Sequence, residues 1–423
     1  MQDLIKKSLK KRYRHEVIFK VCGAISIAFA MIFLVVFFAM IFDKGHKAFI
    51  NHEITLTVDL SKESIIKNSE LEKQYDEMAS VDLIDQIGYS NLIKQAIREK
   101  FSTITDAEKL NNLYAIVSSM ADFSLKNQIE QRPDLIGSKA SLQFGTSSKV
   151  DVYYKYKIAD SFDADEIALL DNFLQNGEIK SIFNWHFLQL ADSREPESAG
   201  IAASLIGSLL TTAIFLLFAF PIGVMCAFYL EEFAKKNRLT DLIEISINNL
   251  AAIPSIIYGL LGLTIYLQFF HLPRSSSLVG GMTLFMLVLP VIIIATRNTI
   301  RAIPQSIRDA AMALGASKMQ VILHHLFPLS VPGIMTGTIL AMSRALGETA
   351  PLLMIGMVAF IADVPQSFSE PATVLPVQIY LWSDSPEIGF AEKTAAAILV
   401  LLAILIAFNL VAIILRKKFE RKW

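Results

Sequence analysis

The stretch RDAAMALGASKMQVILHHLFPLSVPGI, Arg308 to Ile334, lies between two long apolar runs of the chain. It mixes charged, small and apolar residues, whereas its neighbours are almost continuously apolar. The positions Ile307, Ala310, Ala311 and Leu314 follow the i, i+3, i+4, i+7 spacing of an amphipathic helix. The polar side of such a helix is disfavoured in a bilayer interior, so the stretch predicts a surface element between membrane spans.

Local signals divide this surface element into two short helices. Pro304 is suited to the first position of a helix, because its fixed φ fits and its missing donor is not needed there. Gly315 follows where a left-handed cap would end that helix, and Ser317 can cap a second one. The second helix repeats the apolar spacing as far as Pro328, at Met319, Ile322, Leu323 and Leu326. We therefore expect an elbow of two amphipathic helices at 303–328.

Composition places this elbow in a membrane protein. Of the 423 residues, 53% are apolar and only 19% are charged, a balance too hydrophobic for an ordinary soluble domain. A bilayer core of about 30 Å requires about 20 apolar residues in a helix. Six stretches are long enough: 17–42, 201–230, 250–270, 278–295, 334–361 and 394–415. Backbone groups in lipid must bond internally, so we expect an all-α polytopic membrane protein with six transmembrane helices.

Lysine and arginine collect at both ends of the chain. The leader at 1–16 and the tail at 417–423 are basic, and basic residues mark cytoplasmic segments. We therefore expect a multi-pass protein with both termini, and the elbow at 303–328, in the cytoplasm. A cleaved signal peptide is the alternative for the N-terminus, but the apolar run at 17–42 is longer than the apolar core of such a peptide.

A long polar segment at 43–198 separates the first span from the others, and we expect it to fold as an inserted periplasmic α+β domain. Period-two alternation predicts strands at ITLTVDL, ASLQF and VDVYYKYKI, which begin at Ile54, Ala140 and Val150. The stretch NNLYAIVSSMADFSL, from Asn111, suggests a helix. The segment has no metal-ligand cluster, nucleophile signature or glycine-rich phosphate loop in its sequence, so a structural or docking role is the simpler interpretation.

Small residues and prolines shape the five spans that follow. A proline kinks its helix and frees a backbone carbonyl, which neighbouring helices or water must satisfy. Interior prolines occur in four of these spans, at Pro221, Pro254, Pro290 and Pro351. Kinked helices leave cavities, so this pattern favours a transporter weakly. Gly333 and Gly337 have the spacing that permits close approach of two helices.

Two charged residues interrupt the fifth span. Arg344 and Glu348 are one helical turn apart near its middle, where each ionisable group costs about 3 kcal/mol or more. One interpretation is a self-neutralising pair that fixes the rotation of the helix. The other is a transport role, in which the planar guanidinium of Arg344 holds an oxyanion and Glu348 limits the affinity. Arg297, at the end of the fourth span, is a second candidate for the substrate pathway, although a basic residue there also satisfies the topology rule.

The stretch DAAMALG, Asp309 to Gly315, followed by Pro328, resembles the EAA signature of ABC importer permeases. Asp309 replaces the usual glutamate of that signature, and His325 and Phe327 also depart mildly from it. The resemblance implies that this helix docks on a separate ATPase. The coupling residues that it implies are Ile307, Asp309, Ala310, Ala311, Leu314 and Gly315.

The similarity extends from SREPE at 193–197 to ATVLPVQIYLWSDSPE at 372–387, and it covers 193–423 densely. This part resembles the longer form of a permease subunit of the bacterial phosphate-specific ABC importer, whose TR pattern matches Thr296 and Arg297. The resemblance implies a five-helix permease core at 199–416 in the inner membrane. It also implies a sister permease, a periplasmic phosphate-binding protein and an ATPase that holds ATP and Mg.

The sequence contains no GxxxxGK[ST] phosphate loop. We therefore expect a permease subunit for inorganic phosphate that is not itself an enzyme, binds no cofactor, metal or nucleic acid, and is surrounded by membrane lipid. Another oxyanion such as sulfate or molybdate is the nearest alternative. A membrane sensor with a periplasmic ligand domain is a more distant one, because the tail after Leu415 is too short for a cytoplasmic output domain.

Overall fold

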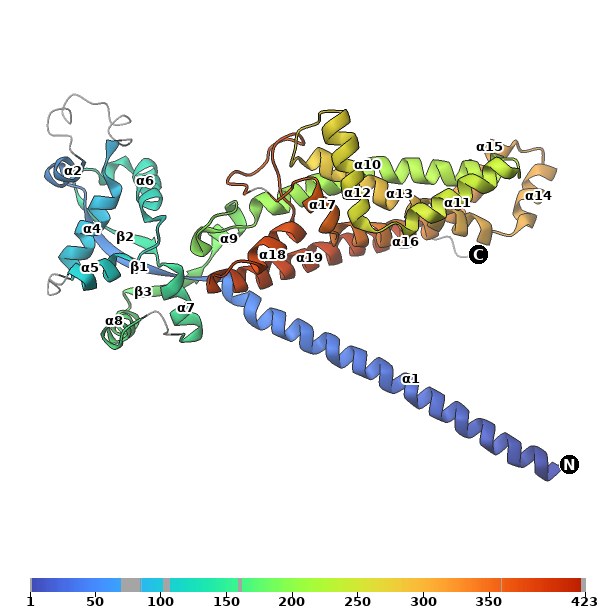
Figure 1. The fold of residues 1–423 in the computed structure, drawn as a ribbon, viewed down its shortest axis with the longest axis horizontal. Coiled ribbons are helices and arrows are strands. Elements are labelled where there is room, and N and C mark those ends of the chain that lie inside the picture. Colours follow the sequence, from blue (N-terminus) through green and yellow to red (C-terminus); the bar gives the residue numbers. More distant parts are fainter. Residues whose placement is uncertain are drawn as a thin grey trace.

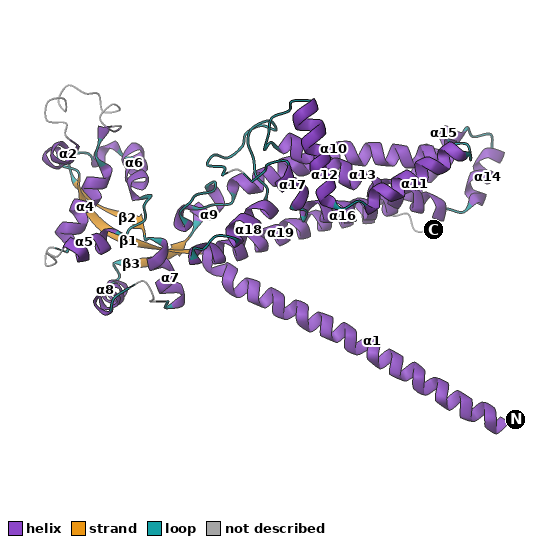
Figure 2. Ribbon diagram, in the orientation of Figure 1, coloured by secondary structure: helices purple, strands orange, loops and turns teal. Residues whose placement is uncertain are grey.

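The computed structural model describes residues 2–69, 84, 86–101, 107–158, 162–358 and 360–419. Most of the predicted tail at 417–423 lies outside these residues. Two parts are evident in Figure 1: a small domain at one end and an elongated helical bundle beside it. Figure 2 shows that the strands are confined to the small domain. The first turns of α1, the last turns of α19 and helix α14 (Gln305–Ala313) all lie towards the end of the molecule away from the strands.

Five helices in the described part of the chain are long and apolar enough to cross a bilayer, and a bent pair would make six. The expectation of a helical polytopic membrane fold is therefore confirmed. The long helices are α1 (Gln2–Gly45), α10 (Ala202–Phe228) with the π-helical η4 (Tyr229–Phe233), α13 (Ser277–Ala302), α16 (Phe327–Leu346) and α19 (Ile388–Phe419). Helix α1 runs apart from the bundle and meets α19 near its own C-terminal end, at Gly45.

The bent pair replaces the straight span expected at 250–270. Helix α11 (Arg238–Ala252) ends before Pro254, and α12 (Ser255–Gly262) continues into the π-helical η5 (Leu263–Phe269). The two parts are bent by 101°. The reason is local, because a proline disfavours helical geometry in the residue before it, and Ile253 is extended.

The fifth span also differs from the prediction of one continuous helix at 334–361. Helix α16 ends at Leu346, and a separate short helix, α17 (Ala350–Met354), follows a break at Gly347–Thr349. At its other end, α15 (Lys318–Val321) and the π-helical η6 (Ile322–Leu326) run without interruption into α16. The predicted second helix of the elbow is thus the beginning of this span. Pro328 does not end it, because it occupies the first turn of α16, where its missing donor costs little.

Helix α13 is the centre of the bundle, with α10 and α16 packed against it. Small residues permit this close packing, as the spacing of Gly333 and Gly337 predicts. A Cβ on Gly337 would lie 2.3 Å from Ala295 Cβ of α13, and one on Gly281 would lie 2.5 Å from Ile214 Cβ of α10. Pro221 and Pro290 remain inside continuous helices. Helix α18 (Leu375–Ser383) packs beside α10 and α19.

The small domain has a three-stranded antiparallel sheet in the order β2-β1-β3. Its strands are β1 (Ile50–Asp59), β2 (Lys139–Gly145) and β3 (Ile179–Phe183). The first two confirm the predicted strands at Ile54 and Ala140, whereas the strand predicted from Val150 is wrong. That stretch forms helix α7 (Ser148–Tyr156), in which Asp151 and Lys155 form an ion pair one turn apart.

Helices cover the sheet and join it to the membrane part. They enclose a core that includes Ile54, Leu56, Leu125 and Phe144. The predicted helix from Asn111 is two helices, α5 (Ala107–Tyr114) and α6 (Ala121–Gln131), with an irregular turn between them. The remaining elements are α2 (Lys62–Ser69), α4 (Tyr89–Lys100), α8 (Ala164–Gln175), α9 (Trp185–Gln189) and the 3-10 turns η1 (His46–Phe49), η2 (Pro133–Leu135) and η3 (Pro196–Ser198).

A buried ionic cluster fixes this domain to the first turns of α19. Lys155 Nζ lies 2.5 Å from Asp151 Oδ2 and 2.7 Å from Glu392 Oε1, and all three side chains are buried. His52 Nδ1 contacts the other oxygen of Asp151 at 2.7 Å. Lys393 donates to the carbonyl oxygen of Ala199. Because a buried charge without its partner is strongly destabilising, this cluster fixes where the domain meets the bundle.

We predict that Gly337→Ala destabilises the bundle. Alanine normally favours a helix by up to about 1 kcal/mol over glycine, but here its methyl group would overlap Ala295. Overpacking of this kind costs about 1–3 kcal/mol, so the midpoint of thermal unfolding of the detergent-solubilised chain should fall. Gly23→Ala on α1 is the control, because nothing lies within 4 Å of its added Cβ. Equal midpoints for the two variants would contradict the packing.

We predict that Lys155→Met destabilises the junction between the domain and the bundle. The change leaves Asp151 and Glu392 buried without their shared cation, a loss of about 3–5 kcal/mol. Limited proteolysis and thermal unfolding should both detect it. The matched control is Lys139→Met, since Lys139 is exposed in its pair with Asp59 and such surface pairs contribute less than about 1 kcal/mol.

Candidate functional site

Helix α14 forms an exposed elbow at the end of the bundle away from the strands. Its predicted apolar stripe divides into two parts. Ala311 is buried and Ile307 is half-buried against the protein, whereas Ala310 and Leu314 are exposed, Leu314 at 90%. The elbow therefore presents apolar side chains that the chain itself does not cover. Exposed Met312, Met319 and Leu323 lie on the neighbouring turns.

The ends of the elbow confirm the predicted caps. Gly315 has a φ of +86°, the left-handed conformation in which glycine is favoured. Ser317 and Gln320 form a reciprocal capping box that starts the next helix. Pro304 is the residue directly before the first helical residue. Asp309 is exposed, and its carboxylate accepts a hydrogen bond from Gln305 Nε2 at 3.2 Å.

Arg308 ties this helix to the spans. Its guanidinium lies 2.9 Å from Glu232 Oε1 and also donates to the carbonyl oxygens of Ile300 and Ile303. Glu232 belongs to η4, at the end of α10, and the two carbonyl groups belong to the end of α13 and the residue after it. The side chains of both Arg308 and Glu232 are largely buried. A movement of α14 therefore displaces the ends of two spans.

Arg297 lies in a second ionic cluster one turn deeper. Its Nε is 2.6 Å from Glu231 Oε1, its Nη2 is 2.8 Å from Glu244 Oε2, and its side chain is 7% exposed. Arg301 contacts the same two carboxylates at 3.0 and 3.1 Å. The cluster joins α10, α11 and α13. Arg297, a predicted pathway residue, is thus engaged by two carboxylates.

Arg344 has a different environment. Its Nε lies 3.6 Å from Glu348 Oε1, a long contact, and its side chain is 44% exposed. Their spacing predicts that the two residues lie on one continuous helix. In the structure they do not, because α16 ends at Leu346 and Glu348 follows that end. In the described part of the chain, Glu348 is the one ion-pair partner of Arg344. This guanidinium therefore keeps free donors for another group.

The two broken spans meet beside this arginine. Helices α12 and α17 pack together, and a Cβ on Gly259 would lie 2.8 Å from Pro351 Cα and Met354 Cβ. The bend before α12 and the break before α17 are thus brought together. Discontinuous helices are typical of the binding sites of membrane transporters, because they place irregular backbone at membrane depth where it is shielded from lipid.

Sequence reasoning missed the carboxylates that organise the first two sites. Glu231, Glu232 and Glu244 are far from Arg297 and Arg308 along the chain, and their pairing depends on how separate helices pack against one another. A signal was present in the pair Glu231 and Glu232, directly after an apolar span. Two adjacent acidic residues at a membrane boundary require cationic partners.

Two family descriptions match different parts of the chain. Residues 219–423 match the binding-protein-dependent transport system inner membrane component. Residues 6–164 match a domain of unknown function, DUF3333. The first match covers the bundle from the last part of α10 onwards, including both ionic clusters, α14 and the two helix breaks.

Similar proteins agree with the first description. The phosphate transport system permease protein PstA of Haemophilus influenzae is 34% identical over 190 residues, which are 45% of this chain and 66% of that protein. PstA of Yersinia pestis is 31% identical over 236 residues, 55% of this chain and 78% of that protein. Among solved structures, the MetNI methionine ABC transporter matches with a TM-score of 0.41 at 16% identity, over 52% of this chain and 95% of that chain.

The matched description covers residues 219–423. That segment contains the exposed elbow, its ionic attachment to the spans and the pair of broken helices. The chain belongs to the family of binding-protein-dependent transport system inner membrane components, and it is an ABC importer permease subunit.

Proposed function

We propose that this chain is a PstA-type permease subunit of an ATP-driven importer that carries inorganic phosphate across the bacterial inner membrane. The observation that carries the proposal is the exposed apolar face of α14, whose opposite face is attached to the spans through Arg308. The sequence contains no GxxxxGK[ST] loop, so the energy has to come from another subunit. The names of the relatives support phosphate as the substrate.

The proposal implies three kinds of partner. An ATPase of the PstB type, with ATP and Mg, would cover Ala310 and Leu314. A sister permease of the PstC type would complete the pore, and a periplasmic binding protein of the PstS type would deliver the anion. Lipid or a partner subunit would cover α1, of whose most apolar window only 6% is buried. We place both termini and α14 in the cytoplasm and the inserted domain in the periplasm, in agreement with their positions at opposite ends of the molecule.

Movement passes from α14 to the spans through paired charges. When the ATPase displaces α14, Arg308 carries Glu232 with it. Glu231, the next residue of η4, holds Arg297 and Arg301 of α13. The ends of α10 and α13 therefore move with the elbow. Such rigid movement of one group of helices against another is the basis of alternating access in transporters.

Arg344 is the residue that we assign to the anion. Its guanidinium is half-exposed and loosely paired, and its planar fork suits two oxygens of a tetrahedral oxyanion. Glu348 competes with the anion for the same donors and so promotes release. Arg297 is assigned to coupling instead, because Glu231 and Glu244 already occupy its donors.

We predict that Ala310→Trp prevents coupling. The large ring would separate α14 from a docked ATPase, so the ATPase should no longer co-purify and phosphate uptake should be lost. Gln305→Trp is the control, since Gln305 lies on the opposite side of α14 by helical spacing and is also exposed. Unchanged co-purification and uptake in Ala310→Trp would refute the docking site.

We predict that Arg344→Gln lowers the rate of phosphate uptake at least about tenfold, which corresponds to about 1.4 kcal/mol of lost interaction. Arg344→Lys should retain part of the activity, because it keeps the charge but loses the fork. Uptake of labelled phosphate by cells that carry each variant is the measurement. Arg194→Gln, at an exposed arginine near η3, is the control.

The same uptake assay identifies which anion is transported. In cells with the unmodified chain, unlabelled phosphate should compete with the label, whereas sulfate and molybdate should not. Full competition by sulfate would favour sulfate over phosphate as the transported anion. Normal uptake by Arg344→Gln, with the ATPase still bound, would remove Arg344 from the pathway.

A further inference from the structure

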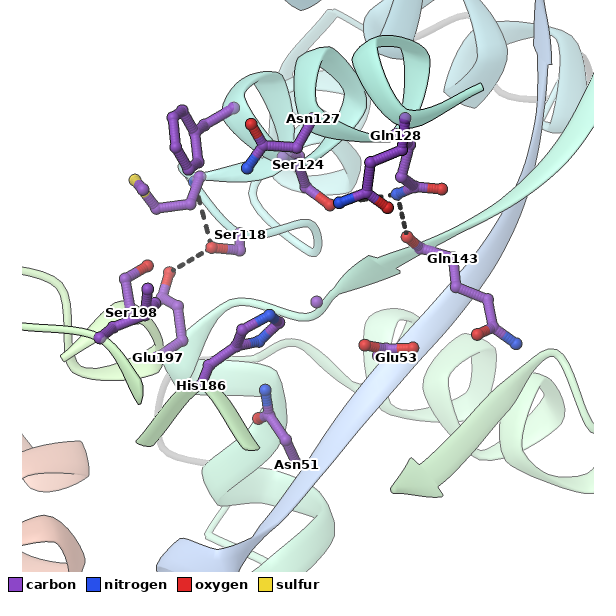
Figure 3. Close-up of a pocket in the computed structure, with 16 residues that line it drawn as sticks. Asn51, Glu53, Ser118, Ser124, Asn127, Gln128, Gln143, His186, Glu197 and Ser198 are labelled. Carbon is purple, nitrogen blue, oxygen red and sulfur yellow. Dashed lines mark hydrogen bonds between the residues drawn. The ribbon is translucent and has the colours of Figure 1, made fainter. Parts of the chain in front are cut away.

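A pocket of about 430 Å³ lies where the inserted domain meets the segment that leads into α10. Its walls come from β1, β2 and α6 of the domain and from α9 and η3 beside the bundle (Figure 3). The volume is in the range of about 300–1,000 Å³ that is usual for small-molecule sites. None of the residues of the proposed anion pathway lines it.

The lining of this pocket is rich in polar groups and, among the residues that the structure describes, includes no lysine or arginine. Two carboxylates, Glu53 and Glu197, are present, and burial raises the pKa of both. Most of the other polar groups are side-chain amides: Asn51, Asn127, Gln128, Gln131 and Gln143. An amide offers a donor and an acceptor side by side, and a carboxylate offers acceptors.

Several of these groups have unused hydrogen-bonding capacity. Asn51 is only 7% exposed, and its side-chain amide makes no hydrogen bond to any residue that the structure describes. Figure 3 shows it directed from β1 towards His186. Glu53 likewise has no hydrogen-bond or ion-pair partner within the described ranges. Glu197 Oε1 accepts a hydrogen bond from Ser118 Oγ at 3.1 Å, whereas its buried Oε2 has no hydrogen-bond partner within the described ranges. A buried amide without a partner is costly unless a ligand or water satisfies it.

The available groups discriminate between classes of ligand. An anion such as phosphate would be repelled by Glu53 and Glu197 and would find no cationic side chain in the lining. An ammonium compound offers only donors and would leave the amide N–H groups facing no acceptor. A hydroxyl group both donates to a carboxylate and accepts from an amide N–H, so it satisfies both kinds of partner.

An apolar surface accompanies these polar groups. Phe123 lines the pocket and is 53% exposed, so its ring offers an apolar face to a bound molecule. Pyranose rings carry hydroxyl groups at their edges and C–H groups on their faces. We propose that this pocket binds a neutral polyhydroxylated ligand of the saccharide class. This site is separate from the anion pathway and does not depend on the transported substrate.

Binding here would connect two parts of the molecule. Asn51, Glu53 and Gln143 belong to the sheet of the domain, whereas His186 and Glu197 belong to the segment before α10. A ligand that contacts both sides stabilises their junction, and the stabilisation grows with ligand concentration. The midpoint of thermal unfolding of the full chain should therefore rise when the ligand binds, so it detects binding independently of a direct titration.

The test uses the full chain in lipid nanodiscs with three probes: maltose, cellobiose and N,N′-diacetylchitobiose. Saturation-transfer NMR and the unfolding midpoint are measured for each probe. At least one disaccharide should bind and raise the midpoint, whereas spermidine should do neither, and any binding of inorganic phosphate through Arg344 should be the same in Gln143→Leu as in the unmodified chain. Binding should weaken at least about tenfold in Asn51→Leu and in Gln143→Leu. Gln189→Leu, at an exposed glutamine of α9 outside the lining, should bind as the unmodified chain does.

Gln143 is exposed on β2, so its replacement keeps the test valid if Asn51→Leu fails to fold. Three results overturn the proposal. The first is the absence of binding by all three disaccharides. The second is binding of spermidine or the peptide Gly-Gly-Gly in their place, or binding of phosphate that Gln143→Leu weakens. The third is disaccharide binding that Gln143→Leu leaves unchanged.

Discussion

A charged side chain that leaves water requires a partner, and the paired charges of this chain determine how its parts hold together. Near α14, Arg297 is enclosed by Glu231 and Glu244. At the other end of the bundle, Lys155 lies between Asp151 and Glu392. Each group would be costly if left alone in a low-dielectric interior. The bundle between these clusters is held by non-directional apolar packing, so the clusters supply the specific attachments.

The first cluster explains how an exposed helix can act on buried ones. Glu231 and Glu232 are adjacent residues of η4, yet they bind different elements: Glu231 binds α13, and Glu232 binds Arg308 of α14. One short segment is thus held from two sides. Its π-helical geometry is less regular than that of an α-helix, and such segments are frequent at functional sites. In the proposed coupling, a displacement of α14 would be transmitted to α10 and α13 together through this segment.

Hydropathy predicted most of the spans, because long apolar helices have few alternatives in lipid. The helix caps at Gly315 and Ser317 were also predicted correctly from the local sequence. The wrong predictions came from sequence signals that are compatible with two different local structures. A proline ends a helix in one context and begins one in another, so the break before Pro351 and the continuity through Pro328 could not be distinguished from sequence. Likewise, the alternation from Val150 fits a short strand, but the chain forms α7 instead.

The candidate site was predictable only where one segment carries it. The elbow is contiguous, so its spacing and caps identified it, but the spacing did not distinguish the exposed Ala310 and Leu314 from Ile307 and Ala311, which pack against the protein. The ionic clusters combine residues from separate helices: Glu244 belongs to α11, which packs against α13, whereas Glu231 and Glu232 belong to η4. No local pattern contains that information. The sequence ranked Arg344 before Arg297 only by depth in the apolar run, and it did not show which carboxylates surround each of them.

The structure separates these two arginines by what surrounds them, and the requirements of transport decide between them. A residue that passes an anion onward needs free donors, yet it must not bind so tightly that release becomes slow. Arg297 fails the first requirement, because two carboxylates at 2.6 and 2.8 Å occupy its guanidinium. Arg344 meets both, since it is half-exposed and Glu348 lies within reach at 3.6 Å as a competitor. Its position beside two helix breaks adds to the argument, because spans that are already interrupted can change their orientation at lower cost than continuous helices.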